Sequence, residues 1–359
     1  MSENSLMIGK PLTSGVARRG VIGEPFKVHH LSVQDVLGGL GRPYTAVVND
    51  PPWTALSTTV PSAARVVPAW NMDLAHLETL IDSNDNGEVV VGIGGGTALD
   101  TAKFLAWKTQ RPLIQIPTIT SVDAGFTNAI GVRIEGNVRY IANIVPEFVV
   151  IDVDVICAAP RQLNRSGIGD ILTCHTGLWD WQQATDKGIG HPWRDDLANL
   201  GQTLLRELDD GAAEVREVTT DGVRWMADAY RRIGAACAEA GHSRFEEGSE
   251  HYWAYAYERH TGAHQVHGEL ICFAVVAMSA VQGNNDMWAF DVVTRAGARA
   301  HPADLGITFD QFSAALLGLR SYARSEELDF GIADIRQLDA GDAQMAWALA
   351  TALPRSGAS

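Results

Sequence analysis

Residues 89–103 read Val-Val-Val-Gly-Ile-Gly-Gly-Gly-Thr-Ala-Leu-Asp-Thr-Ala-Lys. An apolar, β-branched run ends in three successive glycines, and a helical pattern follows without a polar linker. A strand, a glycine turn and a helix start leave backbone N–H groups unpaired, and the helix dipole favours an anion there. Glycine suits this turn because a Cβ would block the close approach of a phosphate. The stretch predicts a phosphate-binding strand–turn–helix unit.

The glycine turn differs from the usual dinucleotide fingerprint. Gly92 and Gly94 supply its first two glycines, but Thr97 occupies the position of the third. A tight strand-to-helix turn that binds no ligand is the alternative interpretation. We favour phosphate binding because three successive glycines carry a high cost in conformational entropy.

Short β-branched runs recur on both sides of this unit, with helical patterns between the early ones. The runs lie at residues 46–48, 89–93, 113–116, 129–134 and 148–151, and the helical patterns at 74–82 and 99–108. This alternation predicts a parallel sheet covered by helices, with a ligand beyond the carboxyl ends of the strands.

After Pro160 the strand pattern disappears. Helical patterns follow at residues 167–181, 195–217, 221–240, 247–259, 270–282 and 309–322. We therefore expect an α/β, Rossmann-like dinucleotide-binding domain over residues 1–158 and an all-α domain over residues 159–359.

Length and composition limit the class of protein. The 359 residues suffice for two domains, and 46% hydrophobic residues describe a globular chain with an ample core. A formal net charge of −15 argues against nucleic acid and anionic membranes as partners. Residues 1–20 lack a signal-peptide core, no apolar run is long enough for membrane insertion, and the four cysteines form no Cys-x-x-Cys. We expect a reducing, cytoplasmic location.

The helical half contains residue types that bind metals. Asp170 lies in an apolar helical pattern, and His251, His260, His264 and His267 occur near acidic residues. One carboxylate with two imidazoles leaves open positions on a divalent cation, which suits Zn²⁺ or Fe²⁺ acting as a Lewis acid. From spacing alone, these histidines fit helix-surface or buried structural roles equally well.

Five motifs in a fixed order carry a family resemblance. They are Gly-Gly-Gly-Thr-Ala-Leu-Asp at 94–100, Pro-Thr-Ile-Thr-Ser-Val-Asp at 117–123, Gly-Ile-Gly-Asp at 167–170, Ser-Arg at 243–244 leading to Gly-Ser-Glu-His at 248–251, and His-Gly-Glu at 267–269. The sequence resembles the polyol dehydrogenases that share a fold with dehydroquinate synthase. That group contains glycerol dehydrogenase and the iron-containing alcohol dehydrogenases, and the chain is most similar to its sn-glycerol-1-phosphate dehydrogenases.

The resemblance implies a set of site residues. It implies a metal held by Asp170, His251 and His267, with zinc as the expected ion and iron or nickel as alternatives. It implies catalytic and substrate-contacting roles for Asp123 and Asp170. It also implies binding of NAD or NADP by a longer set, namely Gly94, Gly95, Gly96, Thr97, Ala98, Leu99, Asp100, Thr118, Ser121 and Thr127.

Further residues near the expected coenzyme site have roles that the sequence leaves open. Asn49 and Asp50, just past the first strong strand, are placed to accept hydrogen bonds from the adenosine ribose. An acid there favours NAD, because it repels the 2′-phosphate of NADP. Lys103 fits either a functional role or an ion pair with Asp100, three residues earlier on the helix.

One residue departs from the pattern of the glycerol-1-phosphate enzymes. In those enzymes a second histidine, one helical turn after the first metal histidine, reaches the substrate, whereas this chain has Tyr255 there. A phenol is larger than an imidazole and carries no positive charge, so it is a poorer partner for a phosphate monoester. We expect Tyr255 to line the substrate pocket.

The expected activity is reversible hydride transfer between NAD(P) and the secondary alcohol of a polyol, giving a hydroxyketone. The substrate is glycerol 1-phosphate-like, or a non-phosphorylated polyol or cyclitol, and the proton acceptor is His264 or a water molecule. The alternatives are an NAD- and metal-dependent cyclase or lyase that regenerates NAD within one turnover, and a non-catalytic binding module. A homo-oligomer is expected.

Overall fold

The computed structural model describes residues 25–356, in two compact units. The first unit contains the described residues up to 159 together with 223–242, and the second contains 160–222 and the described residues from 243 onward. The interpretation of residues 1–20 concerns a segment outside the described range. The domain boundary between residues 158 and 159 stays a prediction. Residues 223–242 lie beyond that boundary in the sequence but belong to the first unit.

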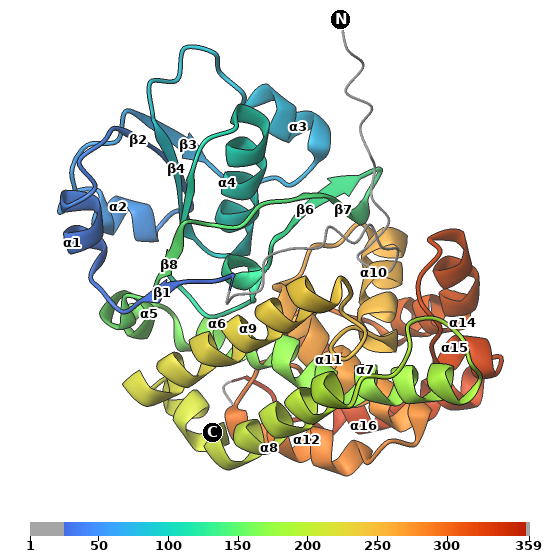
Figure 1. Cartoon of the computed structure of the whole chain (residues 1–359). Coiled ribbons are helices and arrows are strands. Elements are labelled where there is room, and N and C mark those ends of the chain that lie inside the picture. Colours follow the sequence, from blue (N-terminus) through green and yellow to red (C-terminus); the bar gives the residue numbers. More distant parts are fainter. Residues whose placement is uncertain (1–24, 357–359) are drawn as a thin grey trace, which may run out of the picture. The chain divides into compact units, whose positions relative to one another are not determined.

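The first unit is built around a parallel sheet (Figure 1). Its elements are β1 (Val28–His29), α1 (Val33–Gly38), β2 (Tyr44–Val48), α2 (Pro52–Leu56), β3 (Arg65–Pro68), α3 (Leu74–Thr79), β4 (Val89–Gly94), α4 (Gly96–Thr109), β5 (Leu113–Pro117), η1 (Ala124–Phe126), β6 (Ala129–Ile134), β7 (Asn137–Asn143), β8 (Phe148–Val150) and α5 (Val153–Ala158). The six strands lie in the order β1-β8-β5-β4-β2-β3, and every neighbouring pair is parallel. The predicted α/β architecture is confirmed.

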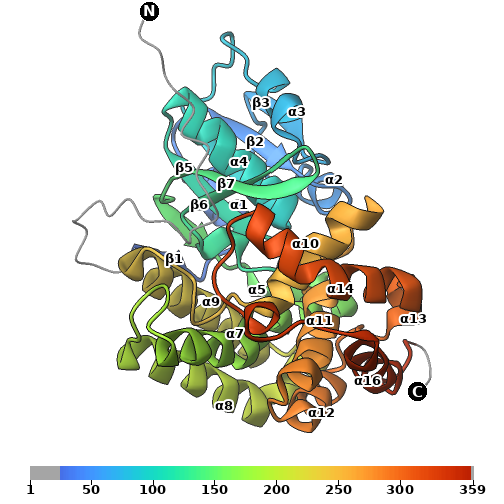
Figure 2. The ribbon, with the colours of Figure 1, turned by 90° about the vertical axis from the view of Figure 1, so that its right-hand side faces the viewer.

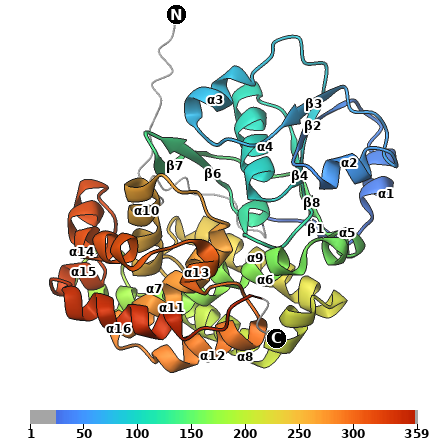
Figure 3. The same cartoon turned by 180° about the vertical axis from the view of Figure 1, so that it is seen from behind.

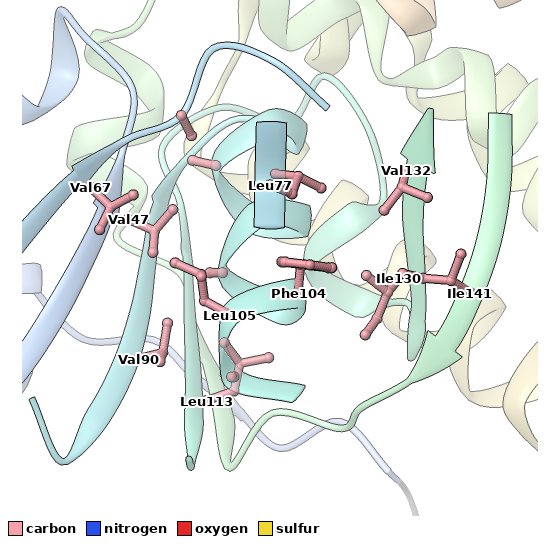
Figure 4. Close-up of a cluster of buried hydrophobic side chains, with 14 residues drawn as sticks. Val47, Val67, Leu77, Val90, Phe104, Leu105, Leu113, Ile130, Val132 and Ile141 are labelled. Atoms are coloured by element: carbon pink, nitrogen blue, oxygen red, sulfur yellow. The ribbon is translucent and has the colours of Figure 1, made fainter. Parts of the chain in front are cut away.

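Strand β4 is apolar at successive positions because side chains cover both faces of the sheet. Val90 packs with Phe104 of α4 in one buried cluster, whereas Val91 packs with Leu37 of α1 in another. In Figure 4, Phe104 lies between the sheet side chains and Ile130 of β6. This two-sided burial holds the glycine turn at the end of β4 at the carboxyl edge of the sheet.

The expectation that residues 129–134 join the parallel sheet is wrong. Strand β6 pairs antiparallel with β7 in a separate two-stranded sheet. Glu135 and Gly136 both have positive φ, 52° and 79°, and Ile134 pairs with Asn137 across them. Two such residues between strands form a tight hairpin turn, so the chain doubles back before it can reach the main sheet.

Helix α9 (Thr220–Ala240) belongs largely to the first unit. The hydroxyl of Tyr230 donates to the carbonyl of Thr120 at 2.9 Å, and the rings of Tyr230 and Phe126 lie 6.1 Å apart. A Cβ at Gly234 would lie 1.8 Å from the carbonyl oxygen of Phe126, so only glycine permits this approach. The helix therefore covers the segment that follows β5.

The second unit contains no strand among its described residues. Its elements are α6 (Arg161–Ser166), α7 (Ile168–Asp186), α8 (Asp195–Glu217), α10 (Ser249–Thr261), α11 (His267–Gln282), α12 (Asp286–Ala296), α13 (Pro302–Leu305), α14 (Phe309–Ser325), α15 (Ile332–Ile335) and α16 (Ala340–Thr351). Helix α11 packs against α7, α10, α12 and α16, and residues 268–282 are buried without interruption (Figures 2 and 3). A helix that is apolar on all sides is typical of a bundle centre. The predicted helical half is confirmed.

All four cysteines are free thiols. Among the described residues, no helix combines the length and the apolar character that crossing a membrane requires.

Candidate functional site

Three side chains from three helices of the second unit converge on one point. Asp170 lies in the first turn of α7, His251 in the first turn of α10, and His267 at the start of α11. One ligand atom from each lies within 4.8 Å of the other two. Nε2 of His267 is 3.3 Å from Oδ1 of Asp170, and the two imidazole centres are 5.4 Å apart. The predicted metal ligands are thus brought together.

Two glycines explain how α7 and α11 meet at this point. A Cβ on Gly169 would lie 2.8 Å from the carbonyl oxygen of Gly268 and 3.1 Å from its Cα. Each of these glycines adjoins a metal-ligand candidate, Asp170 in one case and His267 in the other. The close approach of the backbones therefore sets the distance between the two ligands.

A similar contact positions α10 against α7. A Cβ on Gly248 would lie 2.9 Å from Cα of Gly177 and 2.7 Å from Oδ2 of Asp180. The same carboxylate oxygen accepts the N–H of Ser249 at 2.7 Å, so Asp180 binds the first turn of α10. Burial raises the pKa of Asp180 to about 7, although the charge of Arg244 opposes that shift. His251, two residues further on, is fixed by this contact.

Glu250 orients the imidazole of His251. Its Oε1 lies 3.0 Å from Nδ1 of His251 and also accepts the N–H of Gly248 at 2.7 Å. With Nδ1 held by a carboxylate, Nε2 is the nitrogen that remains for a metal. Burial by itself would lower the pKa of His251, but the hydrogen bond that it donates to Glu250 and the charges of Glu247, Glu250 and Glu246 raise it to about 10. The surroundings thus favour positive charge at this position.

The residues present fit a divalent cation. One carboxylate and two imidazoles form the donor set of a catalytic zinc or iron site with an open coordination position. Asp170 and His251 are buried, whereas the side chain of His267 is 38% exposed. The ligand cluster is therefore reachable from the side of His267.

Tyr255 lies beside this cluster, one turn after His251. The two ring centres are 5.8 Å apart, and the Tyr255 hydroxyl donates to Oε1 of Glu247 at 3.0 Å. The residue is buried, with 8% of its surface exposed. Its role in specificity stays a prediction. His264, a candidate proton acceptor, is exposed.

The glycine turn of the first unit lies where β2, β3 and β4 end. The N–H of Gly95 donates to Oδ1 of Asn49 at 3.0 Å, and Nδ2 of Asn49 donates to the carbonyl of Ala69 at 2.6 Å. Gly94 has a φ of +156°, and a Cβ there would lie 2.4 Å from Asn49. The amide of Asn49 is thus engaged in joining strand ends. Its neighbour Asp50 is exposed and is the better candidate for a ribose contact. Oδ1 of Asp50 accepts hydrogen bonds from the N–H and the hydroxyl of Thr54.

The start of α4 offers backbone donors. The N–H groups of Ala98 and Leu99 bind the carbonyl of Gly95, and both side chains are buried. Among the described residues, no hydrogen bond involves the N–H of Gly96 or Thr97. These two are therefore the donors of this turn that face no protein partner.

The segment after β5 lies against the same turn. The N–H of Thr118 donates to the carbonyl of Gly94 at 3.0 Å, and a Cβ on Gly96 would lie 2.8 Å from Val122. Thr118 is 1% exposed, yet its hydroxyl has no hydrogen-bond partner within the described chain. Buried hydroxyls are normally paired, so this oxygen indicates a ligand position. Ser121 is buried in the same segment, and Asp123 lies at the start of η1.

The contacts of Lys103 indicate a structural role. Its ammonium is fully buried, pairs with Asp100 at 2.9 Å, and donates to Thr127 at 2.7 Å and to the carbonyl of Ala129 at 2.9 Å. The alternative of an ion pair with Asp100 is therefore observed. Thr127 and Asp100, both predicted near the coenzyme, are bound to this lysine.

Sequence reasoning missed three residues near the two sites. Glu250 and Glu247 lie in a quoted motif and beside it, but nothing in the spacing shows that they contact His251 and Tyr255. Trp70 follows β3 at the carboxyl edge, two positions beyond Pro68, and is 71% exposed. An aromatic residue just past a strand run is a signal that could have found it.

Comparison with known proteins finds similarity to one group of enzymes. A family model described as iron-containing alcohol dehydrogenase matches residues 57–160. A glycerol-1-phosphate dehydrogenase [NAD(P)+] from Thermofilum pendens is 29% identical over 87% of this chain and 91% of its own length. Another from Sulfolobus acidocaldarius is 33% identical over 59% of this chain and 61% of its own.

A solved structure shares the fold. A probable glycerol dehydrogenase from Sinorhizobium meliloti matches 89% of this chain and 93% of its own, with a TM-score of 0.67 and 18% identity. The fold, the order of the motifs and these matches agree. The chain is similar to glycerol-1-phosphate dehydrogenases and, over residues 57–160, to iron-containing alcohol dehydrogenases.

Proposed function

We propose that this protein is a metal-dependent, NAD(P)-linked dehydrogenase that interconverts a secondary alcohol of a polyol and the corresponding ketone. The convergence of Asp170, His251 and His267 from three helices carries the proposal. The relatives named above are dehydrogenases that use NAD(P), which supports the same reaction class.

The reaction needs two groups that the chain binds. A divalent cation, for which we propose zinc, supplies Lewis-acid polarisation of the alcohol or ketone oxygen, and a nicotinamide accepts or returns hydride. In the oxidative direction the alcohol loses a hydride to the coenzyme and a proton to solvent. Asp170, His251 and His267 hold the cation, and Glu250 keeps Nε2 of His251 in place.

The first unit supplies the coenzyme contacts. The N–H groups of Gly96 and Thr97 bind a phosphate, and the buried hydroxyl of Thr118 donates to an oxygen of the same ligand. Asp50 accepts from the adenosine ribose, which favours NAD over NADP. Asp123 contacts the substrate. The cytoplasmic location and the homo-oligomer stay predictions.

Replacing one ligand tests the proposal. Asp170→Asn should remove the bound metal and lower NAD(P)-linked turnover by more than the about 10–100-fold typical of outer-shell changes. Metal content by elemental analysis, coenzyme reduction by absorbance and folding by circular dichroism are the measurements. His260→Ala is the control, because this exposed histidine lies on α10, the helix that carries the ligand candidate His251. A variant that keeps both its metal and its rate would disprove this site.

A further inference from the structure

The carboxylate of Glu247 is fixed beside the metal-ligand cluster. Its Oε1 accepts from the Tyr255 hydroxyl at 3.0 Å, and its Oε2 accepts from the Ser243 hydroxyl at 2.7 Å. Only 6% of the residue is exposed. Two hydroxyl donors and burial leave this carboxylate little freedom to turn away.

Among the described residues, no lysine or arginine forms an ion pair with this carboxylate, although its charge acts on the imidazole of His251. The neighbouring Arg244 donates to the main-chain oxygen of Glu247 at 3.3 Å, and it also donates to the Tyr252 hydroxyl at 3.0 Å and to the carbonyl of Phe330 at 2.8 Å. A buried carboxylate whose hydrogen bonds come from two hydroxyls keeps its charge and therefore attracts positive groups and repels negative ones.

The position of Tyr255 connects Glu247 to the substrate. A substrate held at the ligand cluster would lie close to His251, and the centre of the Tyr255 ring is 5.8 Å from the centre of that imidazole. Residues 251 and 255 share one face of α10, since they are four positions apart. The face of α10 that carries the ligand candidate His251 therefore also carries Tyr255, whose hydroxyl connects it to the carboxylate of Glu247.

We propose that Glu247, together with Tyr255, selects a polyol whose tail ends in a hydroxyl or an ammonium group and rejects one that ends in a phosphate monoester. A hydroxyl can donate to this pair, and an ammonium can also pair with the charge. A phosphate brings two negative charges and no donor, so it meets repulsion from a fixed carboxylate. This inference rests on the proposed dehydrogenase function and adds the substrate class.

Three probes of similar shape test the charge preference. Glycerol 1-phosphate, glycerol and 3-amino-1,2-propanediol differ at one end by a phosphate, a hydroxyl and an ammonium. With metal-loaded protein and NAD or NADP, we expect kcat/KM for the phosphate to be at least about tenfold below that for either other probe, as like-charge contacts predict. The same order should appear in the Tm shifts that the three compounds cause without turnover.

Glu247→Gln removes the charge and keeps an oxygen that can accept from Tyr255. It should raise the phosphate-to-hydroxyl ratio of kcat/KM by about tenfold or more. Glu246→Gln is the matched control, since it makes the same charge change one residue earlier and should alter the ratio less than about twofold. If Glu247→Gln does not fold, Tyr255→Phe serves instead. Loss of the hydroxyl donor should then raise the ammonium-to-phosphate ratio by about threefold or more.

The outcomes distinguish the proposed role of Glu247 from the proposed dehydrogenase activity. A wild-type preference for glycerol 1-phosphate, or a ratio that Glu247→Gln leaves unchanged, would overturn the role of Glu247 while the dehydrogenase assignment stands. If no probe supports coenzyme reduction, the dehydrogenase assignment fails. The order of the Tm shifts then decides the charge preference by itself.

Discussion

At the scale of single residues, the orientation of one imidazole depends on one carboxylate. Glu250 holds Nδ1 of His251 and the N–H of Gly248 with the same oxygen. Because the ring can rotate when this contact weakens, Nε2 would no longer be fixed toward Asp170 and His267.

Glu250→Gln should therefore weaken metal binding by about 10–100-fold, the loss typical of an outer-shell partner. Competition with a chromogenic chelator measures the affinity directly. Glu246→Gln is again the control, because Glu246 acts on His251 through its charge, whereas Glu250 also accepts a hydrogen bond from the ring. Equal affinity for wild type and Glu250→Gln would show that the helix backbone alone orients the ring.

The sequence was sufficient to name the ligands but not their supports. Asp170, His251 and His267 are residue types with intrinsic metal affinity, and motif order identifies them. Glu247 and Glu250 are ordinary acids whose roles depend on which side chain lies 3 Å away, and that depends on helix packing. Lys103 shows the converse, since burial and three neighbouring groups determine its structural role.

At the scale of elements, the crossing of α7 and α11 sets the width of the ligand cluster. Gly169→Ala would place a Cβ 2.8 Å from the backbone of Gly268, which cannot move aside as a flexible side chain could. We expect destabilisation of about 1–3 kcal/mol together with weaker metal binding. Urea unfolding and chelator competition measure the two effects.

Gly211 offers a matched control for this change. It lies inside α8, and a Cβ there would meet nothing within 4 Å. Gly211→Ala should therefore stabilise the protein by roughly 0.5–1 kcal/mol, the difference in helix propensity. If Gly169→Ala behaved like Gly211→Ala, the helix crossing would not depend on glycine.

The prediction of helices and strands succeeded where hydrophobic periodicity was strong, and it failed where a tight turn determines how strands pair. The helix at 195–217 was predicted with its observed bounds, because its apolar stripe is regular. The hairpin at 129–143 was missed because two residues, Glu135 and Gly136, reverse the chain. Helix α11 begins at His267, three residues before the predicted start, since its first turn carries ligand chemistry instead of apolar side chains.

At the scale of the whole molecule, one carboxylate ties together the amino ends of the sheet. Oδ1 of Asp85 accepts from the Thr45 hydroxyl at 2.7 Å and the N–H of Gly87 at 2.9 Å. Its Oδ2 pairs with Arg65 at 3.3 Å and Arg111 at 3.1 Å. Burial raises the pKa of Asp85, but the hydrogen bonds from Thr45, Gly87 and Arg111 outweigh burial and lower it to about 2.

A lowered folded-state pKa gives a stability that depends on pH. The unfolded carboxyl has a pKa of about 3.9, so the stabilisation is complete above that value and is lost as pH falls toward 2. Asp85→Asn should lower Tm at pH 7 by about 2–6 °C, and the difference from wild type should shrink toward pH 2–3. Calorimetry between pH 7 and about pH 2 measures this difference in Tm. The control is Asp82→Asn, which makes the same change at an exposed aspartate. A difference in Tm that does not change with pH would show that the charge of the Asp85 carboxylate does not stabilise the fold.

The return of residues 223–242 to the first unit has a consequence for dissecting the protein. The chain passes between the units three times, near residues 159, 222 and 242, so no single cut separates them. A fragment that stops at residue 159 would lack the helix whose Tyr230 binds the carbonyl of Thr120 and whose Gly234 lies against Phe126. It would thus expose the loop that carries Thr118, Ser121 and Asp123. A self-sufficient coenzyme-binding module must instead be made by grafting 223–242 onto that fragment through a new linker.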